Sequence, residues 1–144
     1  MDLTAAAAAA AKESAEMKQI TAMFKALSDE TRLRLFFLLN REKRGVAVCE
    51  LVDAVRKNQY NVSKHLHILE AAGLIRANKS GRWVLYSLEK NLPKGINTLI
   101  LSLDSEKTRM DLKRLKNRLK RRKQGKIILC SPAREFNAKQ EVKK

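Results

Sequence analysis

Two short helical patterns separated by a polar break constrain the fold of this chain most. The first covers residues 50–55 and the second covers residues 60–72, with the break at residues 56–59. In the second pattern the apolar positions share one helical face, and Gly73 follows as a residue suited to ending a helix. Two helices joined by a tight polar turn are the pattern of a helix-turn-helix.

Two β-prone runs follow directly, at residues 74–77 and 83–88. They flank the basic segment 78–82, which contains a glycine, so the three parts together predict a β-hairpin with a charged tip. A short apolar segment at residues 46–49 precedes the first short helix. The sequence therefore predicts a mainly α-helical fold with a small β-hairpin wing, a winged helix-turn-helix.

Longer helical patterns lie on both sides of this unit. An alanine run leads into apolar positions spaced three or four residues apart up to Leu27, and Ser28 is a good N-cap for the next helix. After Pro93, apolar residues from Ile96 to Leu119 predict one long amphipathic helix. The alanine run itself is compatible with a helix or with a disordered start.

These composition changes predict three parts of the chain. Residues 1–11 form an alanine-rich N-terminal extension, residues 12–124 form the winged domain with its added helices, and residues 125–144 form a polar tail that carries Cys130.

The charge of the chain restricts its partners. A formal net charge of +16 and a pI near 10.3 favour an anionic partner, for which DNA, RNA and anionic lipid are the candidates. No apolar run approaches the roughly 20 residues that cross a bilayer, and the N-terminus lacks the pattern of a secretory signal. Two distant cysteines then favour reduced thiols in a cytoplasmic protein without a membrane partner.

Enzyme motifs do not stand out in the sequence. We find no glycine-rich loop for phosphate, no paired-carboxylate site and no nucleophile–base arrangement, so a binding protein is the favoured class.

Two segments resemble a known family. The stretch ALSDETRLRL at residues 26–35 and the stretch VSKHLHILEAAGLI at residues 62–75 resemble the signatures of the ArsR/SmtB family of metal- and thiol-sensing repressors. The resemblance runs from Met23 to Leu88 and implies a cytoplasmic homodimeric repressor of a palindromic double-stranded DNA operator.

Groove chemistry supports that implication. The N-terminal half of the second helix of a helix-turn-helix enters the major groove, where asparagine and glutamine pair with adenine and other polar groups bind phosphates or base edges. The wing tip adds basic side chains for phosphates or a minor groove. The predicted DNA-binding residues are Gln59, Tyr60, Asn61, Ser63, Lys64, His67, Lys79 and Arg82. Arg32 and Arg34 are further candidates for backbone contacts, unless one of them pairs with a neighbouring acid.

The first and last helices resemble the pair that forms the family's dimer. Their apolar faces exceed what a small core can bury alone, although packing within one chain is the alternative. The predicted dimerisation residues are Met17, Ile20, Phe24, Ile96, Leu99, Ile100 and Leu103.

The inducer site departs from the family pattern. The family's metal box is matched by residues 45–51, where the first cysteine is replaced by Ala47 and only Cys49 remains. The last helix lacks the histidine of the family's other site, and His65 is more easily explained by structure or DNA than by a metal. Cys49 and Cys130 therefore form the predicted inducer site, and no resident cofactor is required.

Two thiolates suit several effectors. Trivalent arsenic or antimony with a third ligand is the favoured inducer, and Cu(I) or Hg(II) would also bind. Oxidation or a polysulfide bridge would use the same pair, as in persulfide-sensing members. Further alternatives are a buried Cys49 with an incidental Cys130 in a constitutive repressor, or an architectural or RNA-binding protein that uses the basic run at residues 113–123.

Overall fold

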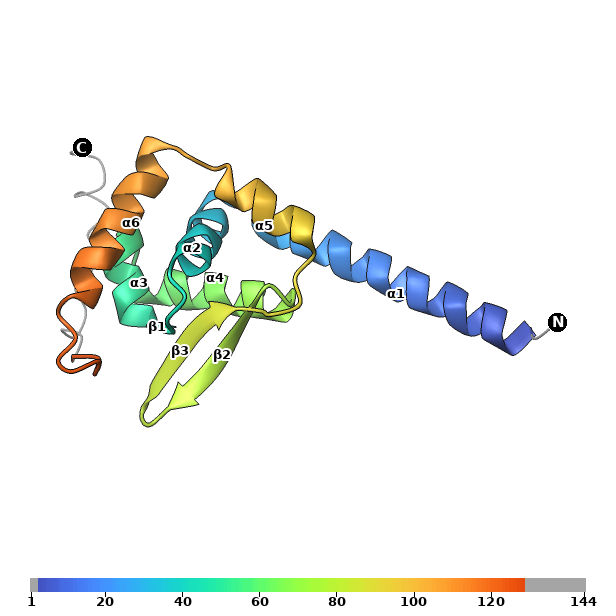
Figure 1. Cartoon of the computed structure of the whole chain (residues 1–144), viewed down its shortest axis with the longest axis horizontal. Helices are drawn as coiled ribbons and strands as arrows, with labels where there is room; N and C mark the ends of the chain where they lie inside the picture. Colours follow the sequence, from blue (N-terminus) through green and yellow to red (C-terminus); the bar gives the residue numbers. More distant parts are fainter. Residues whose placement is uncertain (1–2, 129–144) are drawn as a thin grey trace.

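The computed structural model describes residues 3–128 and confirms the predicted class of fold. Helices dominate, and a small antiparallel sheet lies at one side (Figure 1). The helices are α1 (Leu3–Leu27), α2 (Glu30–Arg41), α3 (Val48–Val55), α4 (Gln59–Ala71), α5 (Lys94–Leu101) and α6 (Glu106–Leu119). The strands are β1 (Val46–Ala47), β2 (Ile75–Ser80) and β3 (Trp83–Leu88).

Helix α1 projects from the rest of the molecule (Figure 1). It includes the alanine run, and only Met23, Ala26 and Leu27 near its C-terminus are buried. Alanine has the highest intrinsic helix propensity, which explains a regular helix without a packed face. No helix among residues 3–128 is long and apolar enough to cross a membrane.

Local capping defines the helix-turn-helix. Helix α3 ends at Arg56, which takes the left-handed conformation with φ 57°, and the side chain of Asn58 accepts a hydrogen bond from the Asn61 amide at the start of α4. At the other end Gly73 has φ +78°, and the amide of Leu74 bonds back to the carbonyl of Leu69 at 3.1 Å. These caps fix the length and direction of α4.

The sheet has one strand more than the predicted hairpin. Strand β1 pairs with β3, with Val46 opposite Tyr86, so the sheet order is β1-β3-β2. The hairpin is tighter than expected, because Ser80 pairs with Trp83 and only Gly81 and Arg82 lie between them. Gly81 supplies the positive φ of 59° that such a two-residue turn requires.

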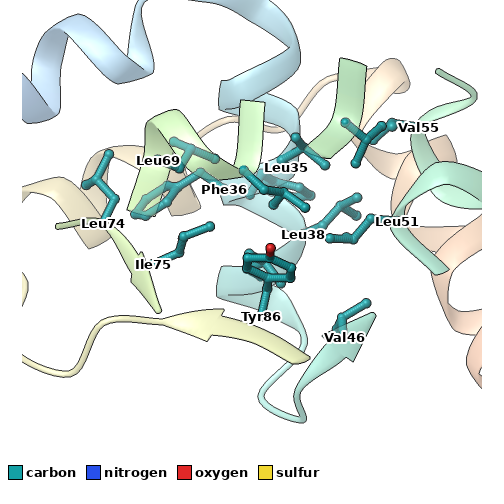
Figure 2. Close-up of a cluster of buried hydrophobic side chains, with 14 of the residues drawn as sticks. Leu35, Phe36, Leu38, Val46, Leu51, Val55, Leu69, Leu74, Ile75 and Tyr86 are labelled. Carbon is teal, nitrogen blue, oxygen red and sulfur yellow. The ribbon is translucent and has the colours of Figure 1, made fainter. Parts of the chain in front are cut away.

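The core lies where α2, α3, α4 and the sheet meet. Leu35, Phe36 and Leu38 of α2 are fully buried, and Figure 2 shows side chains of α3, α4 and the strands around them. Leu51 and Leu69 bring α3 and α4 into the same cluster. This shared core holds the recognition helix rigidly against the domain.

The prediction of one long C-terminal helix from Ile96 to Leu119 is wrong, because the segment forms two helices, α5 and α6. Helix α5 ends at Leu101, and α6 starts after Ser105, whose hydroxyl accepts a hydrogen bond from the Thr108 amide. The Thr108 hydroxyl in turn accepts from the Ser105 amide at 3.1 Å. This capping box lets the chain turn, so that α6 packs on α3.

Candidate nucleic-acid interface and thiol site

Helix α4 presents a polar face opposite its buried face. Val62, Leu66 and Leu69 are fully buried. The polar side chains predicted for DNA contact are exposed along α4, and they are Gln59, Tyr60, Asn61, Lys64 and His67. Ser63 is half-buried among them, and Tyr60 is 76% exposed. All six predicted α4 residues therefore lie on the part of the helix that is not packed against the apolar core.

The tip of the wing is basic and exposed. Lys79 and Arg82 both lie at the β2–β3 turn, and neither is buried. The Arg82 guanidinium sits 5.2 Å from the centre of the Trp83 ring, which limits its motion at the tip. Both predicted wing residues are thus available to an anionic partner.

Arg32, considered above for DNA contact, forms hydrogen bonds within the protein. Its Nε donates to the Ala26 carbonyl at 2.6 Å, and its Nη1 lies 3.1 Å from His65 Nδ1. An arginine only donates, so Nδ1 accepts and His65 is neutral in this arrangement. Burial lowers the pKa of His65, and Asp29 at 3.9 Å opposes that shift only partly. Arg32 thereby joins the end of α1 to the recognition helix.

Arg34 is buried, which excludes the predicted backbone contact to DNA. Its Nε and Nη2 donate to the two carboxylate oxygens of Asp111 on α6, at 2.7 and 2.8 Å, and Nη2 also donates to the Val55 carbonyl at 2.9 Å. Arg114 donates to the same carboxylate at 2.6 Å. Asp111, itself fully buried, thus links α2 and α6 through an ionic network that also includes the partly exposed Arg114.

The predicted dimer residues divide into two groups. Met17, Phe24 and Leu99 are more than half exposed, and Ile20 is 38% exposed. Ile96 and Ile100 are instead buried in the protomer's own core, and Leu103 packs against that core, because the short α5 lies across α2. These three residues are corrected from dimer contacts to core residues. Helices α1 and α5 form the surface that keeps exposed apolar side chains.

Cys49 lies in the first turn of α3, half-buried and disulfide-bonded, which corrects the expectation of reduced thiols. Cys130, the other cysteine of the sequence, lies outside the described residues. The Arg118 Nη2 of α6 is 4.0 Å from the Cys49 Sγ, and its Nε is 2.7 Å from Asp53 Oδ2, one turn along α3.

A second ion pair holds the same end of α3. Glu50 is fully buried, its Oε1 accepts from the Ala47 amide at 3.0 Å, and its Oε2 accepts from Arg122 Nε at 2.8 Å. Arg122 also donates to the Gly45 carbonyl at 2.8 Å. Sequence reasoning missed these contacts, although arginines spaced four residues apart at 114, 118 and 122 indicate one helical face.

The described residues show no ready-made metal site. Among residues 3–128 no group of three or more His, Cys, Asp or Glu side chains is placed to hold a metal ion. Asp104, present where the family's other site would be, forms an ion pair with Arg109 at 2.7 Å on the surface.

The sequence of this chain is similar to those of known regulators. The family model described as bacterial regulatory protein, arsR family, matches residues 29–77. The arsenic resistance transcriptional regulator ArsR2 of Pseudomonas putida is 35% identical over 98 residues, which cover 66% of this chain and 84% of the relative. An uncharacterized HTH-type regulator of Methanocaldococcus jannaschii is 38% identical over 78 residues, 54% of this chain and 86% of that protein.

The match to other relatives is shorter. The arsenical resistance operon repressor of Escherichia coli is 41% identical over 71 residues, which cover 49% of this chain and 60% of the repressor. Among solved structures, the transcriptional regulator HlyU of Vibrio vulnificus superposes with a TM-score of 0.53 at 26% identity. That superposition covers 65% of this chain and 96% of HlyU.

Proposed function

Because the chain belongs to the arsR family of bacterial regulatory proteins, we propose that it is a transcriptional repressor that binds a double-stranded DNA operator. The observation that carries this proposal is the exposed polar face of α4, with Asn61 and Gln59 at its N-terminal end. That end of a recognition helix reads base edges in the major groove, and the wing then contacts the backbone beside it.

The exposed apolar side chains of α1 and α5 support a homodimer. Met17 and Phe24 of α1 and Leu99 of α5 remain more than half exposed. A twofold dimer through this surface would present two recognition helices to a palindromic operator with half-sites about one helical turn apart, or a multiple of it.

Competition binding tests the DNA reading. Selection from random duplexes should yield a palindromic site that the protein prefers over a scrambled duplex by about a thousandfold or more. The double variant Met17→Ser/Phe24→Ser should weaken operator binding and shift the protein toward the monomer in sedimentation. Equal affinity for the selected and scrambled duplexes would instead indicate an architectural protein.

We infer further that Cys49 controls DNA affinity through its disulfide, with Cys130 as the partner thiol. Formation of the bond from two thiols releases two electrons and two protons to an oxidant such as a peroxide, which leaves as water. The support is the disulfide at Cys49 together with Arg118 beside it. Since α3 carries both Cys49 and the turn into α4, a change at its N-terminus can alter how the recognition helix is presented.

A metalloid inducer is the second candidate. Relatives named for arsenic resistance favour trivalent arsenic or antimony, which binds thiolates. Cys49 and Cys130 would supply two sulfurs, and the third ligand would come from elsewhere. This candidate requires reduced cysteines, whereas the oxidative switch consumes them.

One titration separates the two candidates. Complexes with the selected operator are treated with peroxide, a persulfide donor, arsenite, mercuric ion and Cu(I), for the wild type, Cys49→Ser and Cys130→Ser. Release by peroxide that dithiothreitol reverses, and that both variants lack, supports the disulfide switch. Release by arsenite alone supports the metalloid. If no agent releases DNA from the wild type, the protein is a constitutive repressor.

A further inference from the structure

Helix α6 has two basic faces that differ in their partners. Arg114 and Arg118 of α6, and Arg122 just beyond its C-terminus, bind acidic or carbonyl oxygens of α3, and Arg114 also binds Asp111 of α6 itself. Lys113, Lys116 and Lys120 follow a spacing of three and four residues and are exposed. A helix places residues with that spacing on one face, so these three lysines form a single row, here called the lysine row.

The lysine row has no acidic partner among residues 3–128. The sequence contains no aspartate or glutamate from residue 112 to residue 128, and within the described part of the chain none of these lysines forms an ion pair. Lys123 and Lys126, joined by a bridge in the turn after α6, extend the positive charge and are also exposed. An uncompensated row of this kind attracts a polyanion.

The end of α6 lies next to the sheet that carries the wing. Arg122 donates to the Gly45 carbonyl, and Gly45 leads into β1, which pairs with β3. Gly45 is so close to the sheet that an added Cβ would be 2.8 Å from the Cβ of Leu85. The C-terminal end of α6, where the lysine row ends, therefore lies on the β1 side of the sheet, the side away from β2 (Figure 1).

We propose that Lys113, Lys116 and Lys120 bind phosphates of the DNA that flanks the operator beyond the wing. This proposal rests on the proposed function, because the operator must first place the protein on DNA. Seven residues of helix span about 10 Å, which corresponds to the rise of about three base pairs. Lysine is a mobile point charge suited to phosphates whose positions vary with sequence.

The surroundings of the row favour DNA over a membrane or RNA. The apolar residues Leu115 and Leu119 of α6 are buried against the domain, so no broad apolar face remains to enter a bilayer interface. Helix α6 also has no aromatic side chain on which an unpaired base could stack. A duplex needs only backbone charge, which the row supplies.

The test compares two operator lengths. One duplex ends at the edge of the protected core site, and the other extends it by one helical turn, about 10 base pairs, on each side. The variant Lys113→Gln/Lys116→Gln/Lys120→Gln is compared with Arg41→Gln/Lys43→Gln/Lys90→Gln, which removes the same charge from exposed basic residues outside α1, α4, α6 and the wing tip. Circular dichroism and urea unfolding check that both variants fold.

On the extended duplex the lysine-row variant should lose about tenfold or more in affinity, and its dependence of log K on log salt should become shallower by about 2.7 units per protomer. On the short duplex it should match the wild type, and the control should match the wild type on both.

Equal losses on both lengths, or no loss on either, would overturn the proposal. So would an undiminished affinity for the extended duplex combined with lost binding to phosphatidylglycerol vesicles or single-stranded RNA. A wild type without preference for the operator over a scrambled duplex would instead refute the proposed function, which is a separate readout.

Discussion

Helices α4 and α6 both pack on α3, but different forces hold them there. Helix α4 contributes fully buried apolar side chains, including Val62 and Leu66, and keeps its polar side chains in solvent. On α6, Asp111 accepts from the buried guanidinium of Arg34 on α2, and Arg114 donates to a carbonyl oxygen of α3. Just beyond α6, Arg122 donates to the buried carboxylate of Glu50 on α3. The recognition helix is thus fixed by packing, and the C-terminal helix by directional ionic contacts.

This difference has a consequence for control. Apolar packing is non-directional, so α4 keeps its buried face in the core while its position relative to α3 can still adjust. Buried ion pairs require good geometry, and an unpaired member is costly, so α6 has one favourable register on α3. Arg118 of α6 contacts both Cys49 and Asp53 of α3, so this register places its guanidinium beside the sulfur. A change at the thiol therefore acts on the ionic side of α3 first.

The largest expected effect comes from removing the carboxylate at the centre of the ionic contacts of α6. Asp111→Ala leaves Arg34 and Arg114 without their shared carboxylate, and we expect the free energy of unfolding to fall by about 3–5 kcal/mol in urea titrations. Asp104→Ala removes an exposed partner of Arg109 as the control and should cost less than about 1 kcal/mol. Similar small losses for both variants would show that the buried network does not hold α6.

The next largest effect is a loss of operator affinity when an exposed side chain of α4 is removed. Asn61→Ala should weaken binding to the selected operator by about 1–3 kcal/mol while leaving scrambled duplex binding unchanged, because asparagine reads a base edge. Asn91→Ala removes an exposed asparagine outside α4 and the wing and should have no effect. An equal loss on both duplexes would assign Asn61 to the backbone instead.

A smaller effect concerns the start of α4. Asn58→Ala removes the side chain that caps the Asn61 amide at 2.8 Å and should lower the free energy of unfolding by about 1 kcal/mol. Asn58→Ser restores an acceptor and should recover most of the loss. If serine behaves like alanine, the cap does not stabilise the helix.

The smallest effect is a pH dependence. Burial holds the pKa of His65 below its ordinary value of 6.5, so the folded state takes up fewer protons than the unfolded state. The stability from neutral His65 is present above pH 6.5 and declines as the pH falls below it. Asp29 favours the protonated ring, and Arg32, Lys57 and Lys64 oppose it.

Urea unfolding between about pH 7.5 and pH 5 measures this decline. His65→Gln keeps an acceptor for Arg32 and should flatten the slope. His67→Gln, an exposed histidine on the same helix, should keep the wild-type slope. Identical slopes for all three proteins would remove His65 from the explanation.

Sequence reasoning located the helix-turn-helix and the wing because their signals are local. The apolar period, Gly73 and the turn at Gly81 act within a few residues. It missed strand β1, whose two residues gain a partner only in β3, and it missed the buried ion pairs. Arg34 and Asp111 are 77 residues apart and Glu50 and Arg122 are 72 residues apart, so no short pattern reveals them.

The site was predicted in the same uneven way. The α4 face follows from helical period, so its exposed residues agree with the prediction. Ile96 and Ile100 were misassigned to the dimer because the Ser105 cap starts a separate helix, so the short α5 that carries both residues packs on α2. Arg118 beside Cys49 depends on the register of α6 against α3, a tertiary property.

The measurement that tests the control of DNA binding most directly is the operator Kd of one preparation, first reduced and then oxidised. A tenfold or greater difference, equal to about 1.4 kcal/mol of coupling, is predicted for the wild type. Cys49→Ser should show no difference between the two conditions. Equal Kd values for the reduced and oxidised wild type would contradict a switch at Cys49, even if the protein binds its operator tightly.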